Sequence, residues 1–145
     1  MPALTALARD DRSARVLLSI IGTPADVATG KLLTEVGAAE LISIAEGDGT
    51  VPGMDRVEAA VWRDRLLSAA TPDRLAERIV EASKFRVIIP SDPDWPTSLN
   101  DLGARAPYAL WARGRTELLA EPLPQRITVT GARAATSYGA HVTDE

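Results

Sequence analysis

The chain has 145 residues, of which 46% are hydrophobic and only 4% aromatic, so it can form one ordinary core or two small ones from aliphatic side chains. Its formal net charge of −4 argues against binding nucleic acid through overall electrostatics, and the absence of cysteine excludes disulfides, thiolate metal sites and cysteine nucleophiles. The first residues do not resemble a signal peptide, and no apolar run approaches the roughly 18 residues of a membrane span, so we expect a cytoplasmic protein.

The beginning of the chain predicts short helices. A first apolar set recurs at helical spacing and comprises Ala14, Leu17, Leu18 and Ile21. Gly22 ends that helix, and Thr23-Pro24 has the pattern of an N-cap followed by proline at the first helical position. Residues 31–42 predict two short helices about a bend at Gly37.

Two further helices come after a loop. The loop over residues 47–53 is predicted by its glycines, Asp48 and Pro52. The next helix has one apolar face, formed by Ala59, Trp62, Leu66 and Ala69. Thr71-Pro72-Asp73 caps the last helix, whose apolar stripe consists of Leu75, Ile79 and Ala82.

The pattern changes near residue 83. Short strands are predicted at 86–89, 108–112 and 126–130. The prolines of the 91–97 segment predict an irregular loop, and a short helical piece is expected at 116–119.

Charge is unevenly distributed between the two parts. Residues 1–82 have nine Lys and Arg against thirteen Asp and Glu, a net of −4, whereas residues 83–145 have seven of each. The second part also has a run of arginines that faces only Glu117 and Glu121, namely Arg105, Arg113, Arg115, Arg126 and Arg133. A modest local basic patch is therefore possible.

The most informative segment is Gly131 to Gly139, which directly follows the strand predicted at 126–130. A short apolar strand that leads into a glycine turn and a helix-compatible segment is typical of the start of a Rossmann-type sheet. Such a turn leaves backbone N–H groups and a helix N-terminus free to hold an anion. The chain ends at Glu145, so we expect only the beginning of that fold.

The spacing in this segment argues against a dinucleotide cofactor. Of the pattern Gly-x-Gly-x-x-Gly only Gly131 is present, because Arg133 and Thr136 stand at the second and third positions. The Arg133 side chain takes the space of NAD or FAD, so we expect no cofactor. It favours exposed phosphates, which a guanidinium holds through paired hydrogen bonds, and Thr136 and Ser137 add hydroxyl donors. A structural βα turn with a solvent-facing arginine remains the alternative interpretation.

A longer pattern runs from Arg86 onward. It comprises Trp95-Pro96, Leu99, Leu102, Pro107, Leu110-Trp111, Arg113-Gly114 and Val129-Thr130-Gly131-Ala132-Arg133, with Thr136 and Tyr138-Gly139. Each element is weak alone, but their order and spacing resemble the DNA-processing protein A family (DprA, also called Smf), of the actinobacterial type.

The resemblance implies an α + α/β protein. It implies a small N-terminal helical domain over residues 1–82, similar to SAM or helix-hairpin-helix domains, and the truncated beginning of an extended Rossmann fold over 83–145. It also implies a single-stranded DNA-binding recombination mediator without catalytic activity, which helps to load the RecA recombinase in natural transformation and is a homodimer at full length. Carried over to this sequence, it nominates as DNA phosphate-binding residues Gly131, Ala132 and Arg133, followed by Thr136 and Ser137.

Two other functions remain open. A nucleotide phosphoribohydrolase of a related Rossmann class would hold a nucleotide phosphate at the same turn. It would need a catalytic carboxylate, whereas a DNA binder needs added lysines. The third possibility is a truncated product with no function of its own.

The remaining groups predict no catalytic or metal site. His141 is the only histidine and has no metal-ligand spacing to a carboxylate. Asp92 and Asp94 are interpreted as solvated turn residues. We expect the three tryptophans and Tyr138 to pack in the core, although Tyr138 is also a candidate stacking surface for a base. The bend at Gly37 is interpreted as a packing bend rather than as a helix-hairpin-helix contact to duplex DNA.

Overall fold

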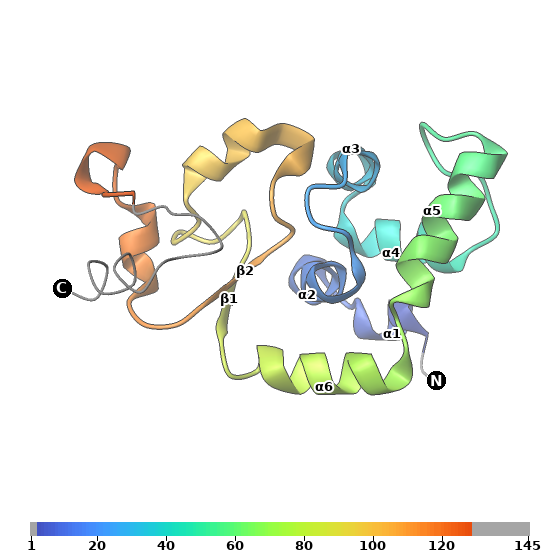
Figure 1. The fold of residues 1–145 in the computed structure, drawn as a ribbon, viewed down its shortest axis with the longest axis horizontal. Helices are drawn as coiled ribbons and strands as arrows, with labels where there is room; N and C mark the ends of the chain where they lie inside the picture. Colours follow the sequence, from blue (N-terminus) through green and yellow to red (C-terminus); the bar gives the residue numbers. More distant parts are fainter. Residues whose placement is uncertain (1–2, 129–145) are drawn as a thin grey trace, which may run out of the picture.

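The computed structural model describes residues 3–128, and six α-helices occupy the first two thirds of that range (Figure 1). The helices are α1 (Leu4–Leu7), α2 (Asp11–Ile21), α3 (Val27–Val36), α4 (Ala38–Glu46), α5 (Arg56–Ser68) and α6 (Pro72–Ala82). The remainder contains β1 (Arg86–Ile88), β2 (Leu110–Ala112) and the 3₁₀ helices η1 (Thr97–Arg105), η2 (Thr116–Ala120) and η3 (Leu123–Gln125).

Acidic side chains set the starts of three helices. Asp10 caps α2 and Asp55 caps α5, each in a reciprocal capping box with the residue three positions later. The Asp26 carboxylate accepts a hydrogen bond from the backbone N–H of Thr29 and caps α3. The prediction that Thr23-Pro24 begins this helix was therefore wrong. Residues 23–25 form a turn instead, because a stronger N-cap is present at Asp26.

The predicted bend at Gly37 is confirmed. Gly37 ends α3 and precedes α4 with φ of 81°, a left-handed conformation that favours glycine. Proline at the first position of α6, after Thr71, is also as predicted.

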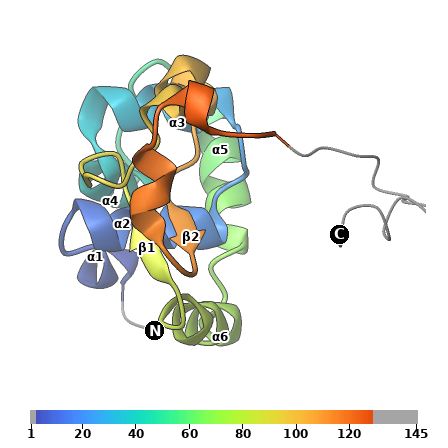
Figure 2. The same ribbon diagram turned by 90° about the vertical axis from the view of Figure 1, so that its left-hand side faces the viewer.

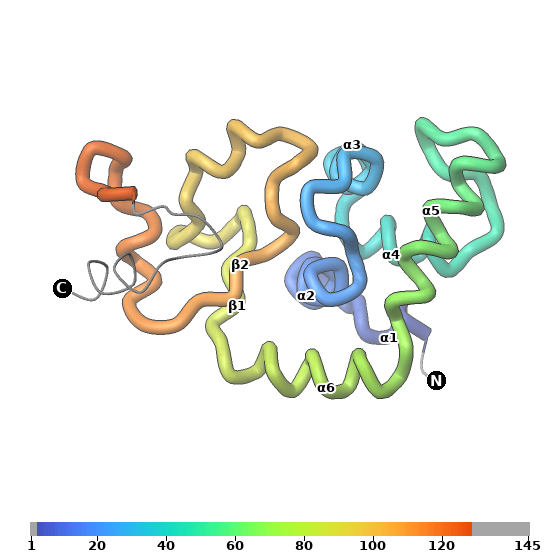
Figure 3. The backbone as a smooth tube through the Cα atoms, in the orientation of Figure 1, coloured from blue at the N-terminus to red at the C-terminus, as the bar shows by residue number. Residues whose placement is uncertain are grey.

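The main core lies among helices α1 to α6, each of which contributes buried side chains to it (Figures 1 and 3). Its most deeply buried side chains include Leu18, Leu41 and Ile42, and Trp62 and Trp95 are buried as expected. Trp111 is half-buried against the same core. Along α6, Leu75 and Ala82 are buried, but Ile79 remains 38% exposed, so the predicted stripe is only partly covered.

The two strands form one antiparallel pair in which Arg86 is opposite Ala112 and Ile88 is opposite Leu110. Both predicted strands are thus present but shorter than expected, and the expected helical piece is η2. Of the third predicted strand the structure describes only residues 126–128, which form no strand. The described residues are therefore a mostly helical α+β fold.

Helix α2 and the turn after it provide side-chain contacts between the helical part and the segment after residue 83 (Figure 2). The Trp111 Nε1–H donates to Ser19 Oγ at 3.1 Å, and the Tyr108 hydroxyl donates to the carbonyl of Thr23 at 2.8 Å. Tyr108 itself is buried in the main core. Helix α3 packs on η1, where Gly30 lies directly against the backbone of Ala104.

Candidate nucleic-acid interface

The predicted phosphate-binding turn lies outside the described residues. This applies to each of its nominated members, Gly131, Ala132, Arg133, Thr136 and Ser137, and also to Tyr138 and His141. The structure does show the segment that precedes the turn, from β1 to residue 128, and the side chains that hold it in place.

The run of arginines expected to form a basic patch is partly neutralised. Arg115 Nε forms a 2.9 Å ion pair with Glu117, and this contact lowers the pKa of Glu117. Arg126 donates to the backbone carbonyl of Glu121. Arg105, at the end of η1, and Arg113, after β2, are exposed and form no ion pair among residues 3–128. The described part of the patch therefore presents fewer unpaired cations than the sequence suggests.

Arg113 is held by an aromatic ring. Its guanidinium lies over Phe85, 4.7 Å from the ring centroid, and Phe85 is tilted against Trp111 with ring centroids 6.0 Å apart. The antiparallel register explains this arrangement, because Arg86 opposite Ala112 puts Phe85 opposite Arg113 at the end of the pair. The result is a positioned, exposed cation, the kind of group that contacts nucleic-acid phosphates.

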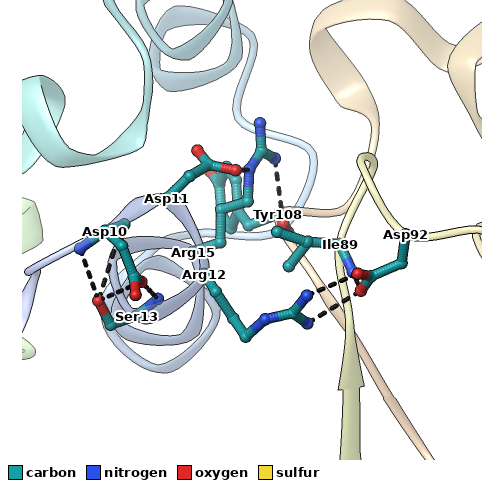
Figure 4. Close-up of polar contacts among 8 residues, drawn as sticks. All are labelled: Asp10, Asp11, Arg12, Ser13, Arg15, Ile89, Asp92 and Tyr108. Atoms are coloured by element: carbon teal, nitrogen blue, oxygen red, sulfur yellow. Dashed lines mark hydrogen bonds and ion pairs between the residues drawn. The ribbon is translucent and has the colours of Figure 1, made fainter.

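The Asp92 carboxylate binds Arg12 of α2 and so connects α2 to the loop after β1, a contact that we call the clamp (Figure 4). The interpretation of Asp92 as a solvated turn residue was therefore wrong. Arg12 of α2 donates from Nη1 to Asp92 Oδ2 at 2.9 Å and from Nη2 to Oδ1 at 2.5 Å. Arg12 Nη1 also donates to the carbonyl of Val87, and the Ile89 N–H donates to Asp92. The guanidinium lowers the pKa of Asp92, mainly through these hydrogen bonds.

Asp94 is also engaged. Its Oδ2 accepts a 2.7 Å hydrogen bond from the hydroxyl of Thr116, which is 1% exposed, and forms a 2.9 Å ion pair with Arg86. Asp94 thus joins β1 to the start of η2. Sequence reasoning missed both roles, because Arg12 is distant from Asp92 in the chain and Thr116 is distant from Asp94.

Trp95, the first residue of the sequence pattern that resembles a known family, supports the loop between β1 and η1. Its side chain is buried, and its indole N–H donates to Asn100 Oδ1 at 3.0 Å. Between this loop and helices α2 and α3 lies a hollow of about 270 Å³, whose lining includes Arg15 and Trp95. The Arg15 guanidinium already has partners within the fold, since it donates to the carbonyl of Tyr108 and forms an ion pair with Asp11.

Neither a metal centre nor a membrane-spanning element occurs in the part of the chain that the structure describes. No group of three or more His, Asp or Glu residues between 3 and 128 is arranged to hold a metal ion. Within the same range no helix combines the length and apolar character needed to cross a bilayer.

Comparison with known proteins finds a family match for the second part of the chain. Residues 86–145 match the model of the family described as DNA recombination-mediator protein A. The resemblance to the DprA family is confirmed. Two curated DprA proteins, described as DNA processing proteins, from the CDC 1551 and H37Rv strains of Mycobacterium tuberculosis, are each 31% identical over 126 residues. The alignment covers 76% of this chain and 32% of each relative, so the chain spans about a third of their length.

The DprA match includes the segment that contains the predicted phosphate turn, because it extends from β1 to residue 145. No solved structure matches the chain significantly.

Proposed function

We propose that this sequence is the N-terminal portion of a DprA-type recombination mediator that binds single-stranded DNA and has no catalytic activity. The observation that supports the proposal most strongly is the family match over residues 86–145, which contains the turn that begins at Gly131. In this proposal an extended Rossmann fold begins at residue 83, and the helical part before it, residues 1–82, is a SAM-like domain.

The proposed contact is between DNA phosphates and the glycine turn. Backbone N–H groups at Gly131 and Ala132 and the guanidinium of Arg133 would hold phosphate oxygens, and the hydroxyls of Thr136 and Ser137 would add donors. Contacts of this kind bind single strands without reading sequence, as a mediator requires. The overall charge of −4 means that such binding depends on a local site.

Fluorescence anisotropy with a labelled oligothymidine of about 20 nucleotides tests this proposal. The compared proteins are the parent chain, Arg133→Ala, and Arg74→Ala as a matched control on exposed α6. We expect Arg133→Ala to weaken binding about tenfold and to reduce the slope of log K against log salt by about 1, whereas Arg74→Ala leaves both unchanged.

Arg133→Lys separates charge from geometry. Lysine keeps the positive charge but loses the paired donors of the guanidinium, so we expect an intermediate affinity. Equal affinities for the parent chain and Arg133→Ala would refute the phosphate site. A preference for duplex over single-stranded competitor would refute the proposed substrate.

The proposed partners rest on the same family assignment. We propose that the protein assists RecA recombinase on single-stranded DNA and that the full-length protein is a homodimer. The test is whether the protein shortens the lag before RecA hydrolyses ATP on DNA already covered by single-strand binding protein. Equal lags with the parent and Arg133→Ala proteins would contradict a loading role that depends on this turn.

A further inference from the structure

Two positively charged side chains at one end of the β1–β2 pair have no acidic partner among residues 3–128. Arg113 directly follows β2, Lys84 lies in the turn between α6 and β1, and both side chains are exposed. Neither forms an ion pair with another described residue. Phe85 lies opposite Arg113 in the register and follows Lys84 in the chain, so both cations belong to the same end of the pair (Figures 1 and 2).

The carboxylates of the neighbouring segments do not neutralise these two cations. Each of those carboxylates is paired with another arginine, in the ion pairs Arg78–Glu81, Arg86–Asp94 and Arg115–Glu117. Lys84 and Arg113 therefore remain as a local surplus of positive charge, although the chain as a whole is acidic. A local surplus of this kind attracts an anionic ligand independently of the net charge of the protein.

The Phe85 ring positions the Arg113 guanidinium. The guanidinium carbon lies over the ring, 4.7 Å from its centroid. The ring in turn packs against Trp111, which is fixed to α2 by its hydrogen bond to Ser19. A guanidinium that lies over a ring can still donate to phosphate oxygens from the N–H groups along its edge. Because the side chain is held before a ligand arrives, less conformational freedom is lost on binding.

We propose that Lys84, Phe85 and Arg113 form a second contact to single-stranded DNA, which we call the strand-pair site. The two cations bind phosphates, and Phe85 is a positioning residue for Arg113. This proposal rests on the proposed function, and it adds phosphate contacts on residues that precede the glycine turn in the chain. Contacts to phosphates alone read no base sequence, so the strand-pair site should bind all single strands similarly.

The salt dependence of binding tests the two cations. For single strands each phosphate contact contributes about 0.7 to the slope of log K against log salt, which is roughly fivefold in affinity at 0.1 M salt. With a labelled oligothymidine of about 20 nucleotides, we expect Lys84→Ala and Arg113→Ala each to weaken binding about fivefold. The double variant should weaken binding about 25-fold and reduce the slope by about 1.4.

A double variant at two other exposed cations, Lys31→Ala/Arg105→Ala, is the matched control. Neither residue forms an ion pair within the described range, so the control removes the same charge from elsewhere on the molecule. We expect it to change the affinity by less than about twofold, because salt screens distant charges. A control that weakens binding as much as Lys84→Ala/Arg113→Ala would contradict the strand-pair site, since overall charge would then explain both losses.

Phe85→Leu tests the positioning role. Leucine removes the ring but leaves every charge, so we expect binding about threefold weaker with an unchanged salt slope. In the Arg113→Ala background the same substitution should have no further effect, because the ring acts through Arg113. Two losses that simply add would overturn the role assigned to Phe85. Thermal unfolding of each variant confirms that it is folded.

Arg133→Ala, measured in the same series, separates this proposal from the proposed function. Weaker binding by Lys84→Ala and Arg113→Ala, together with an unchanged Arg133→Ala, would support the strand-pair site and refute the glycine turn. The opposite result would overturn the strand-pair site and leave the proposed function intact. A parent chain that binds no single-stranded DNA would overturn both.

Discussion

The two parts of the chain approach each other closely at Gly30, and Gly30→Ala tests this contact. A Cβ built on Gly30 would lie 1.8 Å from the carbonyl oxygen of Ala104 and 2.7 Å from its carbonyl carbon. Ordinary carbon–oxygen contacts begin near 3.3 Å, so the backbone of η1 would have to move by roughly 1.5 Å. Because the obstructing atoms belong to the backbone, no side-chain rotation can relieve the clash.

The size and the sign of the effect depend on two opposing terms. Alanine in place of glycine inside a helix stabilises it by about 1 kcal/mol. Overpacking of a close contact costs about 1–3 kcal/mol and more where the backbone must move, so we expect a net loss of about 2 kcal/mol. For a chain of this size that corresponds to a fall in Tm of roughly 4–8 °C.

Urea unfolding followed by tryptophan fluorescence, together with thermal unfolding followed by circular dichroism, measures this loss. Gly49→Ala is the matched control, because nothing lies within 4 Å of a Cβ at that position. We expect the control to change the free energy of unfolding by less than about 0.5 kcal/mol. A Gly30→Ala protein as stable as the parent, or more stable, would show that α3 does not pack on η1 as described.

Two further predictions concern single contacts. Asp92→Asn should lower the free energy of unfolding by about 1 kcal/mol at neutral pH, since the pair with Arg12 is partly exposed, at 46% for Arg12 and 20% for Asp92. The folded-state pKa of Asp92 lies below its ordinary value, so the contribution of the carboxylate is present above about pH 4 and is lost as the pH falls through the folded-state pKa. Denaturant titrations between pH 2 and 7 should therefore show the parent and Asp92→Asn converging in acid, and a constant difference would contradict the clamp. Trp62→Phe should lower the free energy of unfolding by about 2 kcal/mol, because it removes the 2.9 Å hydrogen bond from the indole N–H to the buried Thr29 hydroxyl. Thr29→Val should cost less in the Trp62→Phe background than in the parent chain. If the two costs simply add, the bond contributes nothing to stability.

The helices could be predicted from the sequence because their signals are local. Apolar spacing and glycine located α2, α3 and α4, and Pro72 marked the start of α6. The start of α3 could not be predicted correctly, since Thr23-Pro24 and Asp26 offer competing caps and only the folded chain shows which is used.

The clamp was not predictable because it depends on long-range contacts. Eighty residues separate Arg12 from Asp92, and twenty-two separate Asp94 from Thr116. An acidic pair around a proline has the same local appearance whether it is solvated or paired. A feature that did carry information was the position of Asp92 three residues after Ile89, which allows the carboxylate to accept the Ile89 N–H as a turn residue.

The predicted phosphate site remains a prediction, because all its residues lie outside the described range. The arginines within residues 3–128 show that the number of cations in a segment does not give the charge that is available to bind DNA. Arg86 and Arg115 form ion pairs with Asp94 and Glu117, so their charges are largely balanced locally. Arg113 is positioned by Phe85 instead and keeps its charge available. The neighbours of an arginine in the fold therefore decide how much of its charge is available, and its position in the chain does not.

Helix α2 explains why the helical part matters to the DprA-like segment. Arg12, Arg15 and Ser19 recur at helical spacing, so they lie on one face of α2, and each is bonded to residues beyond 83. This face contacts Val87 of β1, the carbonyl of Tyr108 two residues before β2, and Trp111 of β2. The Tyr108 side chain is buried in the core of the helical part. The division expected near residue 83 thus coincides with a change of sequence pattern but not with a loss of contacts. Strands as short as β1 and β2 are marginal without such support, so α2 is the element that fixes the strand pair from which the proposed DNA-binding segment extends.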